Sequence, residues 1–598
     1  MLEASEVEIS KRIEKLRELM KENQMDTYIV SSFDAHQSEY VAKHWKGREW
    51  LSGFTGSAGT VVVTLDDAGL WTDGRYYIQA EKQLKGSGIQ LFRMMDPGVP
   101  FYSEWLAQTL EEGSTVGFYG ETFSVRLVER MKKDFAKKNI GLNIENDFLD
   151  VLWTDRPELP QTPLFLHDLQ YAGKSVVEKL KEVRAYMHEN KVSHYLLSSL
   201  DDIAWLLNIR GSDVPNNPVV IANVIVTQEV CYLFVDSKKV PHDVKMGLEA
   251  SGIKIDDYRA VYDVLSQLSA GQNITFDAEK TNVLLEAAIP AAVKKMESSN
   301  VTTRLKAVKN PIEIQNMKNA LIRDGVAMVK FIKWMKENIA TETITEIDAE
   351  NQLEAFRNEQ ENFVGPSFDT IAGYKDHAAL MHYKATEDTQ YQLENKGFFL
   401  VDSGGQYLDG TTDITRTIVL GEVTERQKRD YTLVLQGFIA LSRVKFLHGA
   451  TGAHLDVLAR QPIWQHGIDY KCGTGHGVGF FLNVHEGPQS IRTDLNPIVL
   501  EQGMILTNEP GIYLEGQYGI RIENMLVVAE AEKTEFGQFM EFETMTYCPI
   551  DLAGIDVSML TASEKDWLNS YHQTVYEVLA PSLSEDEKKW LANETREI

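Results

Sequence analysis

The chain has 598 residues, so we expect several domains, because a single hydrophobic core stops growing at roughly 250–300 residues. Hydrophobic residues make up 43% and charged residues 25%, as in soluble globular proteins. The 88 acidic against 60 basic residues give a formal net charge of −28, which repels nucleic acid and anionic membranes. We therefore exclude both as main partners.

The cysteine content and the N-terminal residues indicate a reducing compartment. Cys231, Cys472 and Cys548 are too few and too scattered to form a disulfide framework. Residues 1–8 are acidic where a secretory signal would be basic and then apolar. No stretch approaches the roughly 18 uninterrupted apolar residues of a membrane span. We expect a cytoplasmic protein.

The first half of the chain contains an internal repeat. Residues 15–34 realign on a segment that ends at residue 201, and each copy has the pattern of an amphipathic helix, a turn and a strand. Alternating helix and strand patterns predict an α/β domain for each copy. The matching residues are Met20 and Met187, Asn23 and Asn190, Tyr28 and Tyr195, Ser31 and Ser198, and Asp34 and Asp201.

Two junctions divide the chain further. Residues 155–163 contain three prolines and predict an extended linker. Near residue 300 a second junction precedes a helix, with Asn310 as its N-cap and Pro311 at its first position. Residues 561–572 and 584–591 have the pattern of short capped helices. The predicted domains are 1–159, 160–303, 304–552 and a helical extension at 553–598.

Two aspartates lie on a predicted strand pair in the third of these domains. Asp402 ends an apolar run, Gly404 and Gly405 supply a turn, and Asp413 lies within the strand-like segment 407–420. In an antiparallel pair the two aspartates would be neighbours and could share cations. Such a pair is by itself more often structural than metal-binding. Asp409 lies nearer the turn, and we expect it to be solvated.

Three further candidate ligands follow. His476 lies among glycines 473, 475, 477 and 479, which let a ligand approach the backbone closely. The spacing does not fit a phosphate-binding loop. Glu509 precedes a Pro-Gly turn, and Glu523 follows Arg521 by two residues, so both charged groups would share one strand face. Arg521 could then hold a carboxylate of the metal site. We expect Cys472 to be an ordinary buried thiol.

Together, the four carboxylates and one imidazole suit a pair of hard or borderline divalent cations. Two such cations that share a bridging hydroxide can hydrolyse an amide without a protein nucleophile. His382 and His485, near the metal motifs, fit a substrate pocket, although a lone histidine is as often a structural group. A serine hydrolase finds no support, because Ser57 lacks the nucleophile-elbow pattern.

These motifs resemble the pita-bread metallopeptidase family, which holds methionyl aminopeptidases, prolidases and Xaa-Pro aminopeptidases. The resemblance covers the whole chain: residues 50–57 and 73–80 are similar to the creatinase-type N-terminal domain, and the repeat and the tail are typical of the large three-domain cytosolic Xaa-Pro aminopeptidases. It implies an α/β (α+β) protein, with two creatinase-like domains (1–159 and 160–303) before a pita-bread catalytic domain (304–552). It also implies a homodimer.

The resemblance further assigns roles to the candidate residues. Asp413 and Glu523 would bridge two metals, most commonly Mn²⁺, with Zn²⁺ or Co²⁺ as alternatives. Asp402 would bind one metal, and His476 and Glu509 the other. His382 and His485 match positions that contact substrate. Glu509 next to the attacking water would carry the proton to the leaving nitrogen, and His485 would polarise the scissile carbonyl. Arg521 is a further substrate-binding candidate.

The expected activity is thus release of the N-terminal residue from peptides with proline in the second position, by a metal-bridging hydroxide. A prolidase, restricted to Xaa-Pro dipeptides, is the alternative within the family, but the additional N-terminal domain argues against it. A non-catalytic peptide-binding pita-bread module is the alternative from another class. Known modules of that kind have lost metal ligands, whereas this chain has all five.

Overall fold

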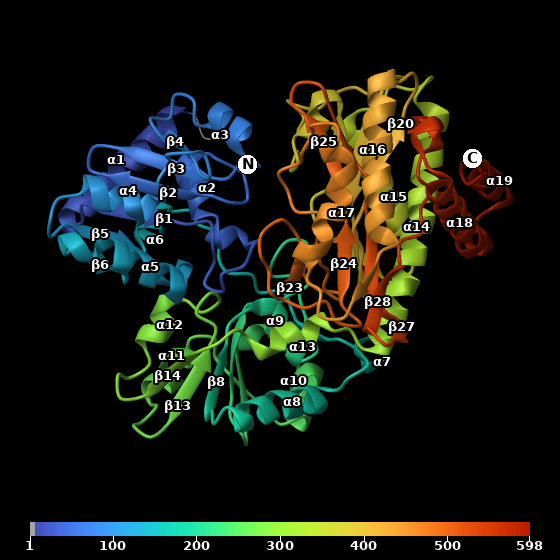
Figure 1. Ribbon diagram of the computed structural model, residues 1–598. Coiled ribbons are helices and arrows are strands. Elements are labelled where there is room, and N and C mark those ends of the chain that lie inside the picture. The colour runs from blue at the N-terminus through green and yellow to red at the C-terminus, as the bar shows by residue number, and fades with distance from the viewer. Residues whose placement is uncertain (1–5) are drawn as a thin grey trace. The chain divides into compact units, whose positions relative to one another are not determined.

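A computed structural model describes residues 6–598 (Figure 1). The chain forms two compact units. The first contains the chain up to Leu166 with Val176–Pro215 and Val219–Thr302, and the second contains His167–Ser175, Asn216–Pro218 and Thr303–Ile598. The segment around α7 (Leu169–Ala172) therefore groups with the second unit, although its sequence position lies within the predicted second domain.

The first unit contains two six-stranded sheets of the same topology, in the orders β4-β3-β2-β1-β5-β6 and β12-β11-β10-β8-β13-β14. In each sheet the first strand of the repeat pairs antiparallel with one neighbour and parallel with the other. The predicted repeat is thus confirmed. The strands are β1 Thr27–Val30, β2 Thr60–Thr64, β3 Ala68–Thr72, β4 Gln90–Arg93, β5 Thr115–Phe118, β6 Gly141–Asn143, β8 His194–Leu197, β10 Ala222–Val226, β11 Cys231–Val235, β12 Ile253–Asp256, β13 Asn273–Phe276 and β14 Lys294–Glu297.

Helices cover both sheets. The helix that opens each repeat, α1 or α8, buries one apolar side, and the matched Met20 and Met187 are fully buried. This one-sided burial is what the 3.6-residue apolar period predicts. The helices are α1 Glu6–Glu22, α2 Gly47–Ser52, α3 Tyr77–Gln83, α4 Tyr102–Thr109, α5 Val125–Phe135, α6 Phe148–Leu152, α8 Val176–Glu189, α9 Leu200–Leu206, α10 His242–Ala250, α11 Ala260–Ser266 and α12 Val283–Ala287.

The second unit is built on a six-stranded sheet of order β21-β28-β27-β24-β22-β23, with two three-stranded sheets, β16-β17-β20 and β15-β18-β19, and the pair β25-β26. The strands are β15 Phe363–Pro366, β16 Ile371–Tyr374, β17 Phe398–Ser403, β18 Gly405–Tyr407, β19 Gly410–Thr411, β20 Ile414–Val419, β21 Lys445–Leu447, β22 Gly475–Gly477, β23 Glu486–Ile491, β24 Ile505–Asn508, β25 Gly511–Leu514, β26 Tyr518–Arg521, β27 Asn524–Thr534 and β28 Gly537–Thr544.

Long helices pack against these sheets. Figure 1 shows α16 and α17 side by side in front of β24, and their Leu441 and Leu455 share a core with Leu506 of that strand. The helix α14 begins at Pro311, and the Asn310 side chain accepts from the amides of residues 312 and 313, so the predicted N-cap is confirmed. The helices are α13 Val301–Ala307, α14 Pro311–Asn338, α15 Glu346–Asn358, α16 Glu425–Ser442 and α17 Gly452–Trp464.

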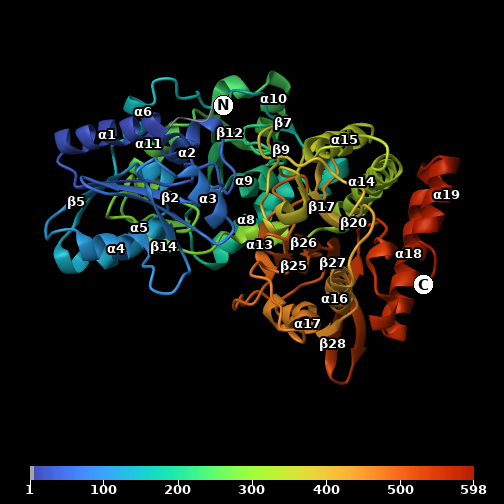
Figure 2. The same ribbon diagram turned by 90° about the horizontal axis from the view of Figure 1, so that it is seen from above.

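The C-terminal extension forms the helices α18 (Ala562–Leu579) and α19 (Glu585–Glu594), as predicted. Each begins with a capping box, Thr561 with Glu564 and Ser584 with Glu587. Figure 2 shows both beside α14, and their leucines join a core formed with α14 and α16. Among the described residues, no helix has the length and apolar character that a membrane crossing requires.

Candidate metal centre

Three predicted ligands lie within reach of a single cation. One donor atom from each of Asp413, His476 and Glu523 can be chosen so that all three lie within 4.8 Å of one another. His476 Nε2 is 3.3 Å from Asp413 Oδ2 and 3.4 Å from Glu509 Oε1. These residues come from different strands: Asp413 immediately precedes β20, His476 lies in β22, and Glu509 follows β24. The sheets thus bring together residues that are up to 110 positions apart in sequence.

Asp402 reaches the same region from β17. The antiparallel pairing of β17 with β20 places it opposite Thr415, two residues after Asp413, so the expected proximity of the two aspartates is present. The expected turn at Gly404 is wrong, however. Residues 405–411 form a further hairpin, β18 with β19, because Gly404 packs tightly against the carbonyl of Thr412 and the chain continues as strand.

The same hairpin overturns the expectation for Asp409. Its side chain is buried (3% exposed) and ion-paired with Arg323 of α14. Because the β18–β19 hairpin packs against α14 instead of projecting into solvent, its turn carboxylate needs a buried partner. Asp409 is therefore a structural group.

Arg521 at the end of β26 connects the acidic residues. Its Nη2 donates to Asp402 Oδ2 at 2.5 Å, its Nε donates to Thr415 Oγ1 at 3.0 Å, and its Nη1 donates to the Tyr513 hydroxyl at 2.7 Å. Arg521 is 3% exposed, so all three contacts are made inside the protein. Of the two roles predicted for Arg521, this geometry favours that of holding a metal-site carboxylate.

Thr415 is a shared partner that the sequence reading missed. Its hydroxyl accepts from Arg521 and donates to Glu523 Oε2 at 2.6 Å, so Arg521 and Glu523 do share one face, as the alternation predicted. The backbone carbonyl of Thr415 also accepts from the Glu523 amide. Its position two residues after Asp413 was the available signal, because alternate residues of a strand lie on one face.

A second threonine supports the other side of the site. The Thr507 hydroxyl donates to Glu509 Oε1 at 3.1 Å and accepts from the His476 amide at 3.0 Å. The His476 Nδ1 lies 2.8 Å from the Gly477 carbonyl, which fixes the ring with Nε2 toward the acids. The His476 and Glu509 side chains are 22% and 19% exposed, against 4% for Asp413, so the site is open on their side.

The two substrate-pocket histidines lie at different places in this unit. The His485 ring packs edge-on against that of His476, with centroids 4.4 Å apart, so it borders the cluster. His382 is half-buried in the segment between the short helix η5 (Lys375–Ala379) and β17. Cys472 is a half-buried free thiol beside the main core, close to the expectation, and burial raises its pKa to about 11.

The concentration of buried acids shifts the pKa values of the site. Burial, followed by repulsion from Asp413, raises the pKa of Glu523 well above its usual range, and burial raises that of Asp402. Burial raises the pKa of Glu509 to about 7. Against the opposing effect of burial, hydrogen bonding to Asp413 and the charge of Glu509 raise the pKa of His476 to about 9. Buried carboxylates that repel one another in this way are stabilised when cations bind to them.

The residues present fit a metal centre. Asp402 Oδ1 is buried, and no donor among the described residues makes a hydrogen bond to it, which is costly unless a ligand occupies it. The donor set of four carboxylates and one imidazole nitrogen matches hard or borderline divalent cations. This geometry and the sheet architecture around it fit the class of metallohydrolases, with Thr415, Thr507 and Arg521 holding the predicted ligands.

Comparison with known proteins narrows that class. Residues 315–530 match the model for metallopeptidase family M24, and residues 538–598 match the C-terminal region of that family. Residues 12–144 and 155–313 each match a creatinase/prolidase N-terminal domain. The chain belongs to metallopeptidase family M24, with two creatinase-type domains before a pita-bread domain.

Full-length relatives share this organisation. The chain is 41% identical to aminopeptidase P2 of Arabidopsis thaliana (99% of this chain, 89% of the relative) and 41% identical to Xaa-Pro aminopeptidase 1 of Dictyostelium discoideum (99% and 97%). The crystal structure of an X-prolyl aminopeptidase from Caenorhabditis elegans, described as a cytosolic enzyme with a di-nuclear active site, matches with a TM-score of 0.94 and 34% identity, covering 99% of this chain and all of that one.

Proposed function

We propose that this protein is an Xaa-Pro aminopeptidase, which releases the N-terminal residue from peptides that have proline in the second position. The observation that carries the proposal is similarity over the full chain, through both creatinase-type domains, to proteins of that name. The buried acidic cluster is the chemical counterpart, because it supplies ligands for hydrolytic metals.

We further propose that the cofactor is a pair of divalent cations, most simply Mn²⁺, with Zn²⁺ or Co²⁺ as alternatives. The residues that would hold them are Asp402, Asp413, His476, Glu509 and Glu523. When bound, two cations polarise a carbonyl and lower the pKa of water enough for it to ionise near neutrality. The chain's own part is to keep these ligands in place.

The residues at the open side of the cluster are assigned the proton and substrate steps. The Glu509 side chain is 19% exposed and pairs with His476, so it can take the proton of the attacking water and carry it to the leaving proline nitrogen. We assign to His485, which packs on His476, the role of donating to the substrate carbonyl oxygen. His382 is assigned to the substrate around the scissile bond, on the resemblance alone. Arg521 supports the metal site indirectly, because it holds the Asp402 carboxylate.

The two alternatives differ in measurable ways. A prolidase would cleave only dipeptides, whereas the full-length relatives are aminopeptidases by name. A non-catalytic peptide-binding module has no need of metal ligands, whereas Asp413, His476 and Glu523 lie close enough together to hold a cation. The main proposal is therefore preferred to both.

The deciding experiment uses the purified full chain with Mn²⁺ and three peptides: Arg-Pro-Pro, Arg-Ala-Pro and the dipeptide Gly-Pro. Release of arginine from Arg-Pro-Pro, none from Arg-Ala-Pro, and loss of release on chelation are the expected results. Cleavage of Gly-Pro alone would establish a prolidase. Binding of Arg-Pro-Pro without cleavage at full metal loading would establish the non-catalytic module.

The proposals for cellular location and for oligomeric state rest on fewer observations. A cytoplasmic protein fits the free thiols Cys231, Cys472 and Cys548 and the cytosolic relative from Caenorhabditis elegans. A homodimer is the expectation of the family resemblance. Light scattering of the purified chain measures the mass directly, and a mass of one chain at micromolar concentration would remove that proposal.

A further inference from the structure

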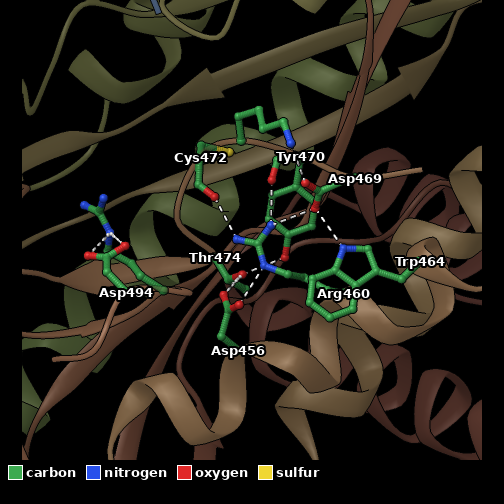
Figure 3. A network of polar contacts seen from close by, with 10 residues as sticks. Asp456, Arg460, Trp464, Asp469, Tyr470, Cys472, Thr474 and Asp494 are labelled. Atoms are coloured by element: carbon green, nitrogen blue, oxygen red, sulfur yellow. Dashed lines mark hydrogen bonds and ion pairs between the residues drawn. The ribbon is translucent and has the colours of Figure 1, made fainter. Parts of the chain in front are cut away.

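A second polar network, buried around Arg460, precedes His476 in the chain (Figure 3). At its middle is Arg460 of α17, which pairs with Asp456 one turn earlier, Nε to Oδ2 at 2.6 Å. Both side chains are almost fully buried, at 2% and 3% exposure. A buried ion pair in a helix is weak evidence for stability, because desolvation offsets most of the attraction. The other contacts of Arg460 indicate the role of this ion pair.

Those contacts all end on the segment that leads into His476. Arg460 Nη1 donates to the carbonyl of Tyr470 at 2.6 Å, and Nη2 donates to the carbonyl of Cys472 at 2.8 Å. The guanidinium also lies over the Tyr470 ring, 3.9 Å from its centroid. A planar guanidinium can make these contacts at once, whereas a lysine could not. Arg460 therefore fixes the backbone between α17 and β22.

Thr474 continues the network toward the ligands. Its hydroxyl donates to Asp456 Oδ1 at 2.5 Å and lies 2.6 Å from the Tyr470 hydroxyl, which must then act as donor. Its carbonyl accepts the amide of Glu509 at 2.8 Å. His476 follows two residues later. Thr474 thus connects the ion pair to the two predicted ligands, through its hydroxyl on Asp456 and its backbone next to His476 and Glu509.

The glycines of this segment make such support necessary. A Cβ on Gly475 would lie 2.0 Å from the carbonyl of Thr507, and one on Gly477 would lie 2.2 Å from that of Glu486. The close packing of β22 against its neighbours therefore requires glycine on both sides of His476. Glycine loses more conformational entropy on ordering than any other residue. Side chains from outside the strand must supply the rigidity that its own residues cannot.

We propose that Asp456, Arg460, Tyr470 and Thr474 form a positioning network that fixes the backbone of His476 and Glu509 for one of the two cations. None of the four contacts the predicted cations or substrate; they act through the two ligands. This rests on the proposed function, because it assumes a dinuclear site.

The test measures Co²⁺ binding to the demetallated full chain, by absorption and by competition with a chelator. Thr474→Val removes the hydroxyl with little change of shape, and Thr474→Ser restores it. We expect T474V to bind one of two Co²⁺ ions about 10–100-fold more weakly, as on loss of other groups that support metal ligands, and T474S to stay within about threefold. Asp469→Asn is the matched control: Asp469 touches Arg460 and Trp464 at the exposed end of the network, away from Thr474.

Tyr470→Phe gives a second route should T474V fold poorly, because it removes only the hydroxyl that donates to Thr474. We expect Y470F to bind the same Co²⁺ ion more weakly, as in T474V. The melting temperature of metal-free Y470F should be near that of D469N. Wild-type affinity for both ions in folded T474V or Y470F would overturn the network. Wild-type protein that binds fewer than two Co²⁺ ions and cleaves no Arg-Pro-Pro would instead overturn the proposed function.

Discussion

Arg521 donates to Oδ2 of Asp402 across 2.5 Å, while Oδ1 of the same carboxylate is buried and accepts no hydrogen bond from the described residues. The arginine therefore fixes the carboxylate and leaves one oxygen for a ligand. Holding a metal-binding carboxylate by one oxygen is how neighbouring groups set its orientation.

Replacing Arg521 by lysine should weaken cation binding. Lysine keeps the charge but cannot donate to Asp402 and Thr415 together, so we expect Mn²⁺ affinity and kcat/KM to fall about 10–100-fold. Tyr513→Phe is the control, because it removes a partner of Arg521 without touching Asp402. Calorimetric titration with Mn²⁺ measures the effect, and wild-type affinity in R521K would show that Asp402 needs no such support.

The same substitution should lower turnover at Asp413 and stability at Asp409. Asp413→Asn removes a predicted bridging ligand, so we expect turnover to fall at least about 100-fold, beyond the loss from removing a supporting group, with the fold intact. Asp409→Asn leaves Arg323 with a neutral partner, and we expect a loss of about 1–3 kcal/mol in stability with unchanged turnover at the same metal loading. Melting curves beside Arg-Pro-Pro assays separate the two outcomes. Full activity of D413N would contradict the bridging role.

The metal-free protein should lose stability as the pH rises. The pKa of Glu509 is raised from 4.5 to about 7 and that of His476 from 6.5 to about 9, so the folded state holds protons that the unfolded chain has released. Stability then falls with pH, for Glu509 between pH 4.5 and 7 and for His476 between 6.5 and 9. Cations compete with those protons, so the melting temperature gained on adding Mn²⁺ should grow over the same range.

Melting curves in chelator and in Mn²⁺ from pH 5.5 to 8.5 provide the measurement. Glu509→Gln is the control, because it removes the Glu509 titration and the charge that helps to raise the pKa of His476, so it should flatten the metal-free curve. A metal-free melting temperature that rises steadily through this range, equally in both proteins, would refute the assignment of these pKa shifts.

Glu346 should hold the segment that carries His382. Its carboxylate accepts from the Tyr383 hydroxyl at 2.8 Å, from His377 Nδ1 at 3.0 Å and from two backbone amides. Because His382 is adjacent to Tyr383, we expect Glu346→Gln to raise KM for Arg-Pro-Pro by about tenfold, the equivalent of one strong hydrogen bond of 1.4 kcal/mol, with Mn²⁺ affinity unchanged.

Lys375→Ala provides the matched control for that variant, since Lys375 lies on the same segment but pairs with Glu394 at the exposed surface. An exposed pair contributes at most about 1 kcal/mol, so K375A should keep its KM. Equal KM in E346Q and wild type would show that Glu346 does not support the substrate site.

Much of the architecture could be predicted from local patterns. The N-cap at Asn310 and the capping boxes at Thr561 and Ser584 are read within four residues of sequence, and the structure confirms the helices they begin. The matched repeat predicted two related sheets, and both have the same strand order. Such features are determined by periodicity and by hydrogen bonds between near neighbours, which sequence displays directly.

The tertiary structure decided the environment of each residue. Sequence motifs predicted Asp402, Asp413 and His476 as ligands. The support from Thr415 and Arg460 could not be predicted in this way, because it depends on strands and helices that come together only in the folded protein. Asp409 was misread for the same reason, because its burial is due to a helix 86 residues earlier in the chain. Burial and contact are properties of packed surfaces, so a carboxylate's sequence neighbours cannot show whether a cation, an arginine or water will face it.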